Sequence, residues 1–170
     1  MIDVKNRKNK TYEALKKAIE PYQEMLTSWE NNEACTKSVN IIISGKRPIK
    51  RVLAETKRWV QIDGRITDLG KNYDPEFMPI ISGHYHEICD VSMLFRKCPT
   101  LKLKNISKTA KKVAAEGKKL RIWKTPENRE TWDALLANGV DVINSDSLQM
   151  LSSFLNERNE TGPLFTLESE

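Results

Sequence analysis

Five short runs of apolar and β-branched residues are spread along the chain and are separated by segments with helical periodicity. The runs are "MIDVK" at residues 1–5, "SVNIIIS" at 38–44, "WVQID" at 59–63, "KLRIW" at 119–123 and "VDVIN" at 140–144. Short runs of this composition favour β-strands, and strands that alternate with helices are typical of βαβ units with a parallel sheet. The pattern therefore predicts an α/β fold.

The segments between the runs place apolar residues at i, i+3 and i+4, which is typical of amphipathic helices. Helices are predicted within residues 11–26, 48–58, 106–117, 125–139 and 146–158. Pro21 is a candidate kink position in the first helix, because proline cannot donate a backbone hydrogen bond. Gly117 and Gly139 suit the C-terminal ends of two helices, and either Thr125 or Asn128 suits the N-cap of the fourth.

One long irregular region runs from Gly64 to Thr100. A connection of this length in a compact α/β domain usually carries function or an inserted lid. Within it, "MPIIS" at residues 78–82 is either a further short strand or a loop. His84 and His86 could point the same way, as in a metal site, but no third ligand is adjacent and the spacing does not favour metal binding.

The composition, 39% hydrophobic and 30% charged, is ordinary for a globular domain. No apolar segment approaches the roughly 20 residues that span a bilayer, so no transmembrane segment is expected. The first residues also lack the apolar core of a secretory signal. Cys35, Cys89 and Cys98 show no CxxC spacing, and we expect unpaired thiols.

The net charge of +5 is mild but concentrated, since eight basic residues and one acidic residue lie between Lys102 and Arg121. The ordinary interpretation is a solvated helix face. The alternative is a surface, residues 102–121, that contacts anionic lipid headgroups or nucleic acid, with nucleic acid the less favoured partner.

Charged and aromatic residues follow several of the predicted strands. In parallel α/β folds, functional groups gather at the C-terminal ends of strands. Two-residue alternation places the members of each pair on one face of a strand. The pairs are Asp3 with Lys5, Asp63 with Arg65, and Arg121 with Trp123, and Lys124 follows the last pair. If these residues converge, they form a polar opening at the strand ends. Its carboxylates could bind a metal ion such as Ca²⁺ or Mg²⁺, and its basic side chains could hold a phosphate.

Each pair also has a simpler interpretation. Asp3 and Lys5 can form a structural ion pair, and Trp123 can be a core residue. Asp146, after the last predicted strand, is more typical of a turn or helix cap than of a ligand.

Segments in order along the chain resemble one family. They are "MIDVK", "IIISGKRP", "QIDGRITDL", "MPIIS" and "KKLRIWKTPENRETWDALLANGVDVINSD". Over residues 1 to about 155 the chain resembles the C-terminal part of bacterial phosphodiesterases of the phosphatidylinositol-specific phospholipase C and glycerophosphodiester phosphodiesterase superfamily. The resemblance implies a partial TIM (β/α)8 barrel within residues 1–158, with about five βα units and without the N-terminal strands, followed by a flexible tail at 159–170.

The resemblance implies a phosphoric diester hydrolase domain that acts on glycerophosphodiesters or phosphoinositide-type lipids with a divalent cation, Ca²⁺ or Mg²⁺. Residue by residue, it implies catalytic contacts from Lys5 and Arg121, substrate binding by Arg65, Trp123 and Lys124, and metal binding by Asp3 and Asp63.

The chain departs from the family in one respect. The family's catalytic histidines lie in an N-terminal part, in motifs of the His-Asn-Asp-Tyr, Glu-x-Asp and His-Asp kind, and none of these motifs occurs here. We therefore expect activity only if a missing N-terminal half completes the site. The alternative is an inactive remnant or a binding module that uses the basic face. Relatives are often exported, but the sequence indicates no compartment.

Overall fold

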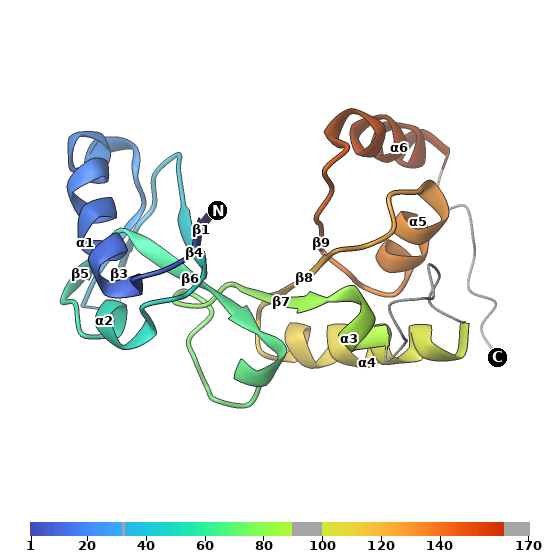
Figure 1. The fold of residues 1–170 in the computed structure, drawn as a ribbon, viewed down its shortest axis with the longest axis horizontal. Helices are drawn as coiled ribbons and strands as arrows, with labels where there is room; N and C mark the ends of the chain where they lie inside the picture. The colour runs from blue at the N-terminus through green and yellow to red at the C-terminus, as the bar shows by residue number, and fades with distance from the viewer. Residues whose placement is uncertain (32, 90–99, 162–170) are drawn as a thin grey trace. The chain divides into compact units, whose positions relative to one another are not determined.

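The computed structural model describes residues 1–31, 33–89 and 100–161 (Figure 1). The chain divides into two compact units. The first comprises Met1–Gly64 and Tyr73–Pro79, and the second comprises Arg65–Asn72 and the described residues of Ile80–Glu170. Each unit is described in turn.

The first unit is built on parallel strands in the order β1 (Ile2–Val4), β4 (Ile41–Gly45) and β6 (Val60–Arg65). Asp3 of β1 pairs with Ser44 of β4, and Ile43 pairs with Ile62 of β6. Ile43 and Ile62 are fully buried, which accounts for the apolar character of these runs. The strands predicted from the first three runs are confirmed.

The first unit also contains three helices. They are the α-helices α1 (Lys8–Ile19) and α2 (Ile49–Leu53) and the 3₁₀ helix η1 (Glu20–Met25). The helix predicted over 11–26 is α-helical only to Ile19. Pro21 lies in the first turn of η1, where its missing N–H is tolerated. The predicted interruption at this proline is therefore confirmed as a change of helix type.

The first unit also contains a small antiparallel sheet that the pattern did not predict. Its strands lie in the order β3 (Glu33–Cys35), β2 (Ser28–Glu30) and β5 (Lys57–Arg58). Trp29 is buried. The guanidinium carbon of Arg58 lies 4.2 Å from the centroid of the Trp29 ring, and the indole nitrogen of Trp29 donates a 2.7 Å hydrogen bond to a carboxylate oxygen of Glu76. Burial lowers the pKa of Arg58 from its ordinary value. These tertiary contacts, and not an apolar run, hold the sheet.

The second unit contains parallel strands in the order β7 (Ile80–His84), β8 (Lys119–Trp123) and β9 (Val142–Ile143), and the short helix η2 (Ile66–Asp68). The last two strands confirm the predictions from "KLRIW" and "VDVIN". The structure decides between the two interpretations of "MPIIS", because β7 begins within it and continues to His84.

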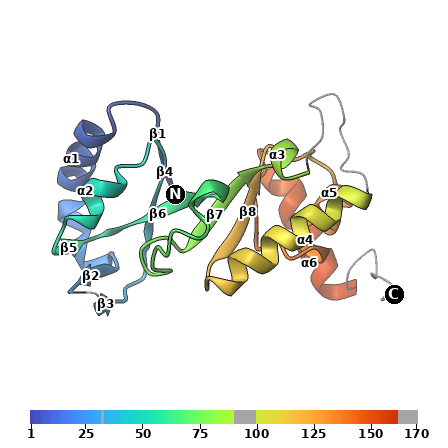
Figure 2. The same ribbon diagram turned by 90° about the horizontal axis from the view of Figure 1, so that it is seen from below.

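Helices α3 (Tyr85–Cys89), α4 (Thr100–Ala115), α5 (Arg129–Ala137) and α6 (Leu148–Thr161) follow in this unit. Figures 1 and 2 show α4 running along β8. Asn128 caps α5, since its side chain accepts a 2.8 Å hydrogen bond from the backbone N–H of Thr131. Asn128, and not Thr125, is therefore the N-cap. Trp132 of α5 packs with Leu151 and Phe154 of α6.

The α/β class, with parallel strands and intervening helices, is confirmed in both units. One prediction is wrong, because Cys89 is buried and disulfide-bonded, whereas Cys35 is an exposed free thiol. Cys98 and most of the predicted tail lie outside the described residues. In the described part of the chain, no helix has both the length and the apolar character needed to cross a membrane.

Candidate functional site

The candidate site lies at the C-terminal ends of β7 and β8 in the second unit. The strand register places Ser82 opposite Arg121 and His84 opposite Trp123. Since side chains two residues apart share a face of a strand, these four residues form one patch. The predicted grouping of Arg121 with Trp123 is confirmed, and the register adds two residues from β7.

Arg121 is held by side chains from both neighbouring strand ends. One terminal nitrogen donates a 3.2 Å hydrogen bond to Ser82 Oγ, and the other donates a short hydrogen bond to the side-chain oxygen of Asn144. The backbone N–H of Asn144 in turn donates to the carbonyl of Ile122. The orientation of the guanidinium is therefore set by hydrogen bonds to residues at the ends of the neighbouring strands.

Trp123 is half-buried at the last position of β8. Its ring meets the imidazole of His84 edge-on, with 4.5 Å between ring centroids. Lys124, the next residue, is exposed and adopts a left-handed backbone with φ of 60°. This conformation ends the strand and begins the turn toward α5. Thr125 closes the turn, because its hydroxyl donates to the carbonyl of Asn144.

Gly83 permits the close packing of α3 against the end of β7. A Cβ at this position would lie 2.4 Å from Cδ1 of Ile88 and 3.1 Å from a side-chain carbon of Ile66. A larger residue would require the side chain of Ile88 to move. The glycine thus allows Ile88 of α3 to pack directly against the strand beside His84.

His84 is 8% exposed. Burial lowers the pKa of its imidazole from the ordinary value, and the positive charge of Lys124 and the neighbouring His86 act in the same direction. Glu87 opposes the shift. The neutral imidazole is therefore favoured at this strand end.

The first unit carries its own set of strand-end residues. Lys5 and Asp3 form an ion pair, with 81% and 50% of their respective side chains exposed. This geometry agrees with the simpler interpretation of the pair. Asp3 also lies tightly against Gly45, since a Cβ there would be 2.1 Å from its carboxylate.

Asp63 is fully buried in β6. One of its carboxylate oxygens accepts a 2.6 Å hydrogen bond from Ser44 Oγ, and its backbone carbonyl accepts from Arg47. Arg65 ends the same strand, and its backbone N–H donates to the carboxylate of Asp68. Asp63 and Arg65 thus share a strand, as the alternation predicted, and both take part in local hydrogen bonding.

The predicted metal ligands do not make a complete cation site. Among the described residues, no group of three or more His, Cys, Asp or Glu side chains is arranged to hold a metal. Asp3 and Asp63 supply two carboxylates, and the first is paired with Lys5, whereas Ca²⁺ takes about six to eight oxygen ligands. These two carboxylates could supply only part of the ligand set of a divalent cation.

The basic stretch divides into an exposed and a buried part. Lys104, Lys108, Lys111 and Lys112 of α4 are exposed and line a shallow surface groove on that helix. In contrast, Lys118 is buried and forms an ion pair of 2.5 Å with Glu116. The exposed lysines of this stretch therefore lie mainly on α4, with Lys119 exposed at the start of β8.

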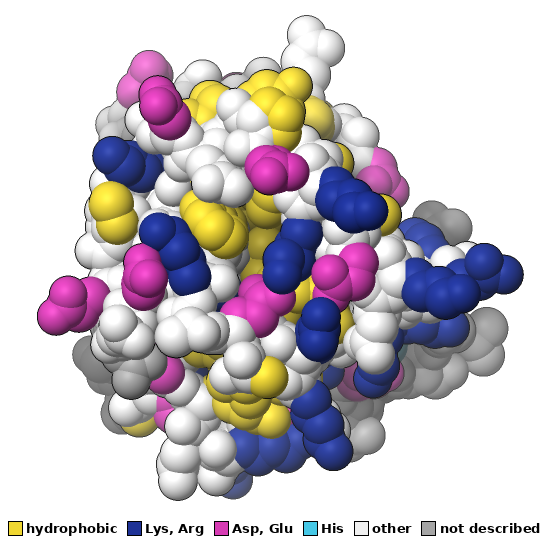
Figure 3. All heavy atoms as spheres, turned by 90° about the vertical axis from the view of Figure 1, so that its left-hand side faces the viewer, with side chains coloured by type: hydrophobic (Ala, Val, Ile, Leu, Met, Phe, Trp, Pro, Cys, Tyr) yellow, Lys and Arg dark blue, Asp and Glu magenta, His cyan; other side chains and the backbone are white. Residues whose placement is uncertain are grey.

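The face that carries α1 and α2 has a different charge distribution. Figure 3 shows Lys and Arg side chains interspersed with Asp and Glu side chains on this side of the molecule. Two of the pairs are Arg51 with Glu13 and Lys16 with Glu55. Mixed charges of this kind do not create a field of one sign, so this face is not a candidate anion-binding surface.

Comparisons with known proteins do not assign a family. No family model matches the chain, and no curated protein or solved structure matches it.

Proposed function

We propose that the patch of Arg121 and Trp123 binds a phosphodiester, and that the chain is part of a phosphoric diester hydrolase domain. The substrates would be glycerophosphodiesters or phosphoinositide-type lipids, and the fold would be part of a (β/α)8 barrel. Sequence resemblance supports the family. The observation that carries the proposal is the guanidinium of Arg121, oriented by Ser82 and Asn144 at the ends of parallel strands.

The residue types suit this ligand. A guanidinium presents paired N–H donors whose geometry matches phosphate oxygens. The half-buried indole of Trp123 offers an apolar surface beside it, against which a glycerol or inositol carbon face can pack. Lys124 adds an exposed positive charge at the same strand end. Together these residues would bind a phosphoryl group and the alcohol portion attached to it.

Cleavage would require more than this patch. In the family that this chain resembles, phosphodiester hydrolysis uses a histidine acid–base pair. The corresponding motifs are missing from this chain. We propose that Lys5 contacts phosphate, that Arg65 binds substrate, and that Asp3 and Asp63 contribute ligands to Ca²⁺ or Mg²⁺ in a completed enzyme. The isolated chain would then bind phosphodiesters without turning them over.

Binding of glycerophosphoinositol and glycerophosphocholine, followed by NMR of the tryptophan indole signals, tests the proposal. We expect wild-type protein to bind at least one of them. Arg121→Gln should weaken binding by about 10- to 100-fold, since a hydrogen-bonded charge pair is lost. Lys119→Gln is the matched control, because Lys119 is exposed at the opposite end of the same strand, and it should bind as wild type.

Turnover is measured separately with bis(p-nitrophenyl) phosphate, with and without Ca²⁺ or Mg²⁺. Failure of both soluble phosphodiesters to bind, or equal affinity of wild-type and Arg121→Gln proteins, would overturn the binding proposal. Turnover that is lost in Asp3→Asn would instead show that the chain is active alone.

A second candidate function is supported by α4. Lys104, Lys108, Lys111 and Lys112 are exposed, while Ile106, Ala110 and Val113 are buried on the other side of the helix. This arrangement suits contact with an anionic surface, lipid before nucleic acid. Binding to phosphatidylserine vesicles that weakens with salt and is lost when Lys108, Lys111 and Lys112 are changed to Gln would support it. Binding that survives these changes would contradict it.

A further inference from the structure

His84 has a geometry that the proposed phosphate contacts do not use. It lies on β7 opposite Trp123, on the same face as Arg121, which lies diagonally across on β8. Strand spacing and rise place such diagonal neighbours about 8 Å apart between Cα atoms. Side chains of this length can therefore reach one phosphoryl group from two strands.

The imidazole ring of His84 is fixed on several sides. The residue is only 8% exposed. Its ring meets the Trp123 ring edge-on, with 4.5 Å between the two centroids, and the centroid of the His86 ring lies 5.5 Å away. Its Nδ1 accepts a 3.1 Å hydrogen bond from the backbone N–H of His86. His84 immediately precedes α3, so this bond is an N-cap interaction made by an imidazole.

This hydrogen bond decides where the imidazole proton resides. A neutral imidazole carries one N–H and one acceptor nitrogen. Because Nδ1 accepts from His86, the proton is on Nε2, which is therefore a donor. Among the described residues, the hydrogen bond seen at this ring is the one to Nδ1. Burial favours the neutral ring, as does the nearby charge of Lys124, so this donor persists at neutral pH.

We infer that Nε2–H of His84 donates a hydrogen bond to a phosphoryl oxygen of the ligand held by Arg121, and that His84 is a ligand-binding residue and not the acid–base catalyst. The inference rests on the proposed phosphodiester site. As a general base, Nε2 would have to lose its proton and Nδ1 gain one. The Nδ1–H would then face the N–H of His86, donor against donor.

A purely structural role, as the cap of α3 alone, is the alternative, and the two roles can be separated. His84→Asn keeps a good capping acceptor but removes the distant donor. His84→Ala removes both. If His84 binds the ligand, the Asn variant should retain the thermal midpoint of wild type yet bind glycerophosphoinositol about 10- to 100-fold more weakly. If His84 only caps α3, the Asn variant should retain both stability and affinity, which would overturn the inference.

The tautomer is tested independently by long-range ¹H–¹⁵N NMR, because the chain contains only two histidines. His86→Gln assigns the signals and keeps the backbone N–H. We expect His84 at pH 7 to show protonated Nε2 and unprotonated Nδ1, with the Nε2 signal shifting on addition of glycerophosphoinositol. Protonated Nδ1, or an Nε2 signal that stays fixed while the Trp123 indole responds to ligand, would refute the inference.

These measurements separate the phosphodiester site from the contribution of His84 to it. Weak binding by Arg121→Gln together with wild-type affinity in His84→Asn would leave the phosphodiester site intact and remove His84 from it. Absence of any response to the ligand in the wild-type protein would remove both.

Discussion

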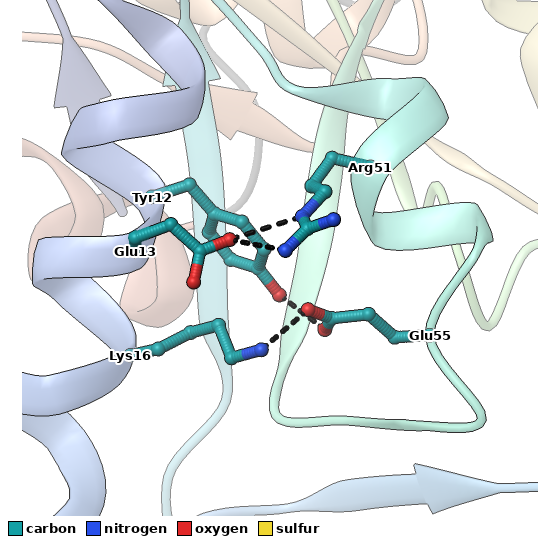
Figure 4. Close-up of polar contacts among 5 residues, drawn as sticks. All are labelled: Tyr12, Glu13, Lys16, Arg51 and Glu55. Atoms are coloured by element: carbon teal, nitrogen blue, oxygen red, sulfur yellow. Dashed lines mark hydrogen bonds and ion pairs between the residues drawn. The ribbon is translucent and has the colours of Figure 1, made fainter.

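The phenol of Tyr12 in α1 donates a 2.6 Å hydrogen bond to the carboxylate of Glu55, which follows α2 (Figure 4). Lys16, one turn later in α1, donates to the other oxygen of the same carboxylate at 2.7 Å. Tyr12 is 1% exposed. Burial, the hydrogen bond and the charge of Glu55 raise the pKa of Tyr12 above its ordinary range. The phenol therefore remains protonated and a hydrogen-bond donor at neutral pH.

Tyr12→Phe should lower the free energy of unfolding by about 1–2 kcal/mol, because the Glu55 carboxylate loses a partner in a largely buried position. Urea denaturation measures the loss. Arg51→Gln is a suitable control, since it breaks an exposed ion pair between α2 and Glu13, the neighbour of Tyr12 in α1. The control should lose much less. Equal losses in the two variants would contradict the importance of the buried hydrogen bond.

Gly45 occupies a position that other residues cannot occupy. Its φ is 71°, and a Cβ would lie 2.1 Å from Oδ1 of Asp3 and 2.4 Å from the backbone carbonyl oxygen of Val4. Gly45→Ala should therefore destabilise the protein by more than the roughly 1–2 kcal/mol that a left-handed backbone costs. Gly70→Ala provides the matched control, because Gly70 has a φ of 78° but no atom near its Cβ position.

The Gly45 prediction is checked by thermal or urea unfolding of both glycine variants. Adding Asp3→Ala to Gly45→Ala should restore only part of the stability, since the clash with the backbone of Val4 persists. If Gly45→Ala were as stable as Gly70→Ala, the predicted clash of the added methyl group with Asp3 and Val4 would be contradicted.

The parallel strands were predictable because their apolar runs are local signals of burial. Ile43, Ile62 and Ile122, one in each of three strands, are fully buried. The pairing of Arg121 with Trp123 on one face followed from alternation alone. In contrast, β2, β3 and β5 carry sequences without apolar alternation, and β2 is held through distant contacts of Trp29 with Arg58 and Glu76.

His84 shows why the site was only partly predictable. The sequence "IISGH" carries a strand signal that ends in glycine and histidine, and it could have placed His84 at a strand end. The contact with Trp123 and the alignment of Ser82 with Arg121 depend on the pairing of β7 with β8, across more than thirty residues. No local pattern specifies that pairing.

Asp133 of α5 is fully buried and accepts a 2.7 Å hydrogen bond from Nε of Arg158 in α6. Arg158→Met should lower the free energy of unfolding by about 2–3 kcal/mol, because a buried carboxylate loses a charged donor. The double variant Asp133→Leu/Arg158→Met should lose less than the single variant, since no buried charge is then left without this donor.

Urea denaturation of the two variants gives the comparison. Arg129→Gln serves as the control, because Arg129 and Glu157 form an exposed ion pair between the same helices, and its effect should be small. A double variant that is less stable than Arg158→Met would argue that Asp133 contributes mainly through its other contacts.

The pH dependence of stability should reveal the buried imidazole of His84. Its pKa in the folded protein is lowered from the ordinary 6.5, by burial first and then by Lys124 and His86 against Glu87. The unfolded chain therefore binds a proton more readily than the folded protein does. The stability that depends on a neutral His84 is complete above about pH 6.5 and is lost as the pH falls through the lowered pKa. His84→Asn, which cannot titrate, should lose less stability than wild type between pH 7 and pH 5. Urea denaturation at several pH values checks this, and parallel curves for the two proteins would show that protonation of His84 does not oppose folding.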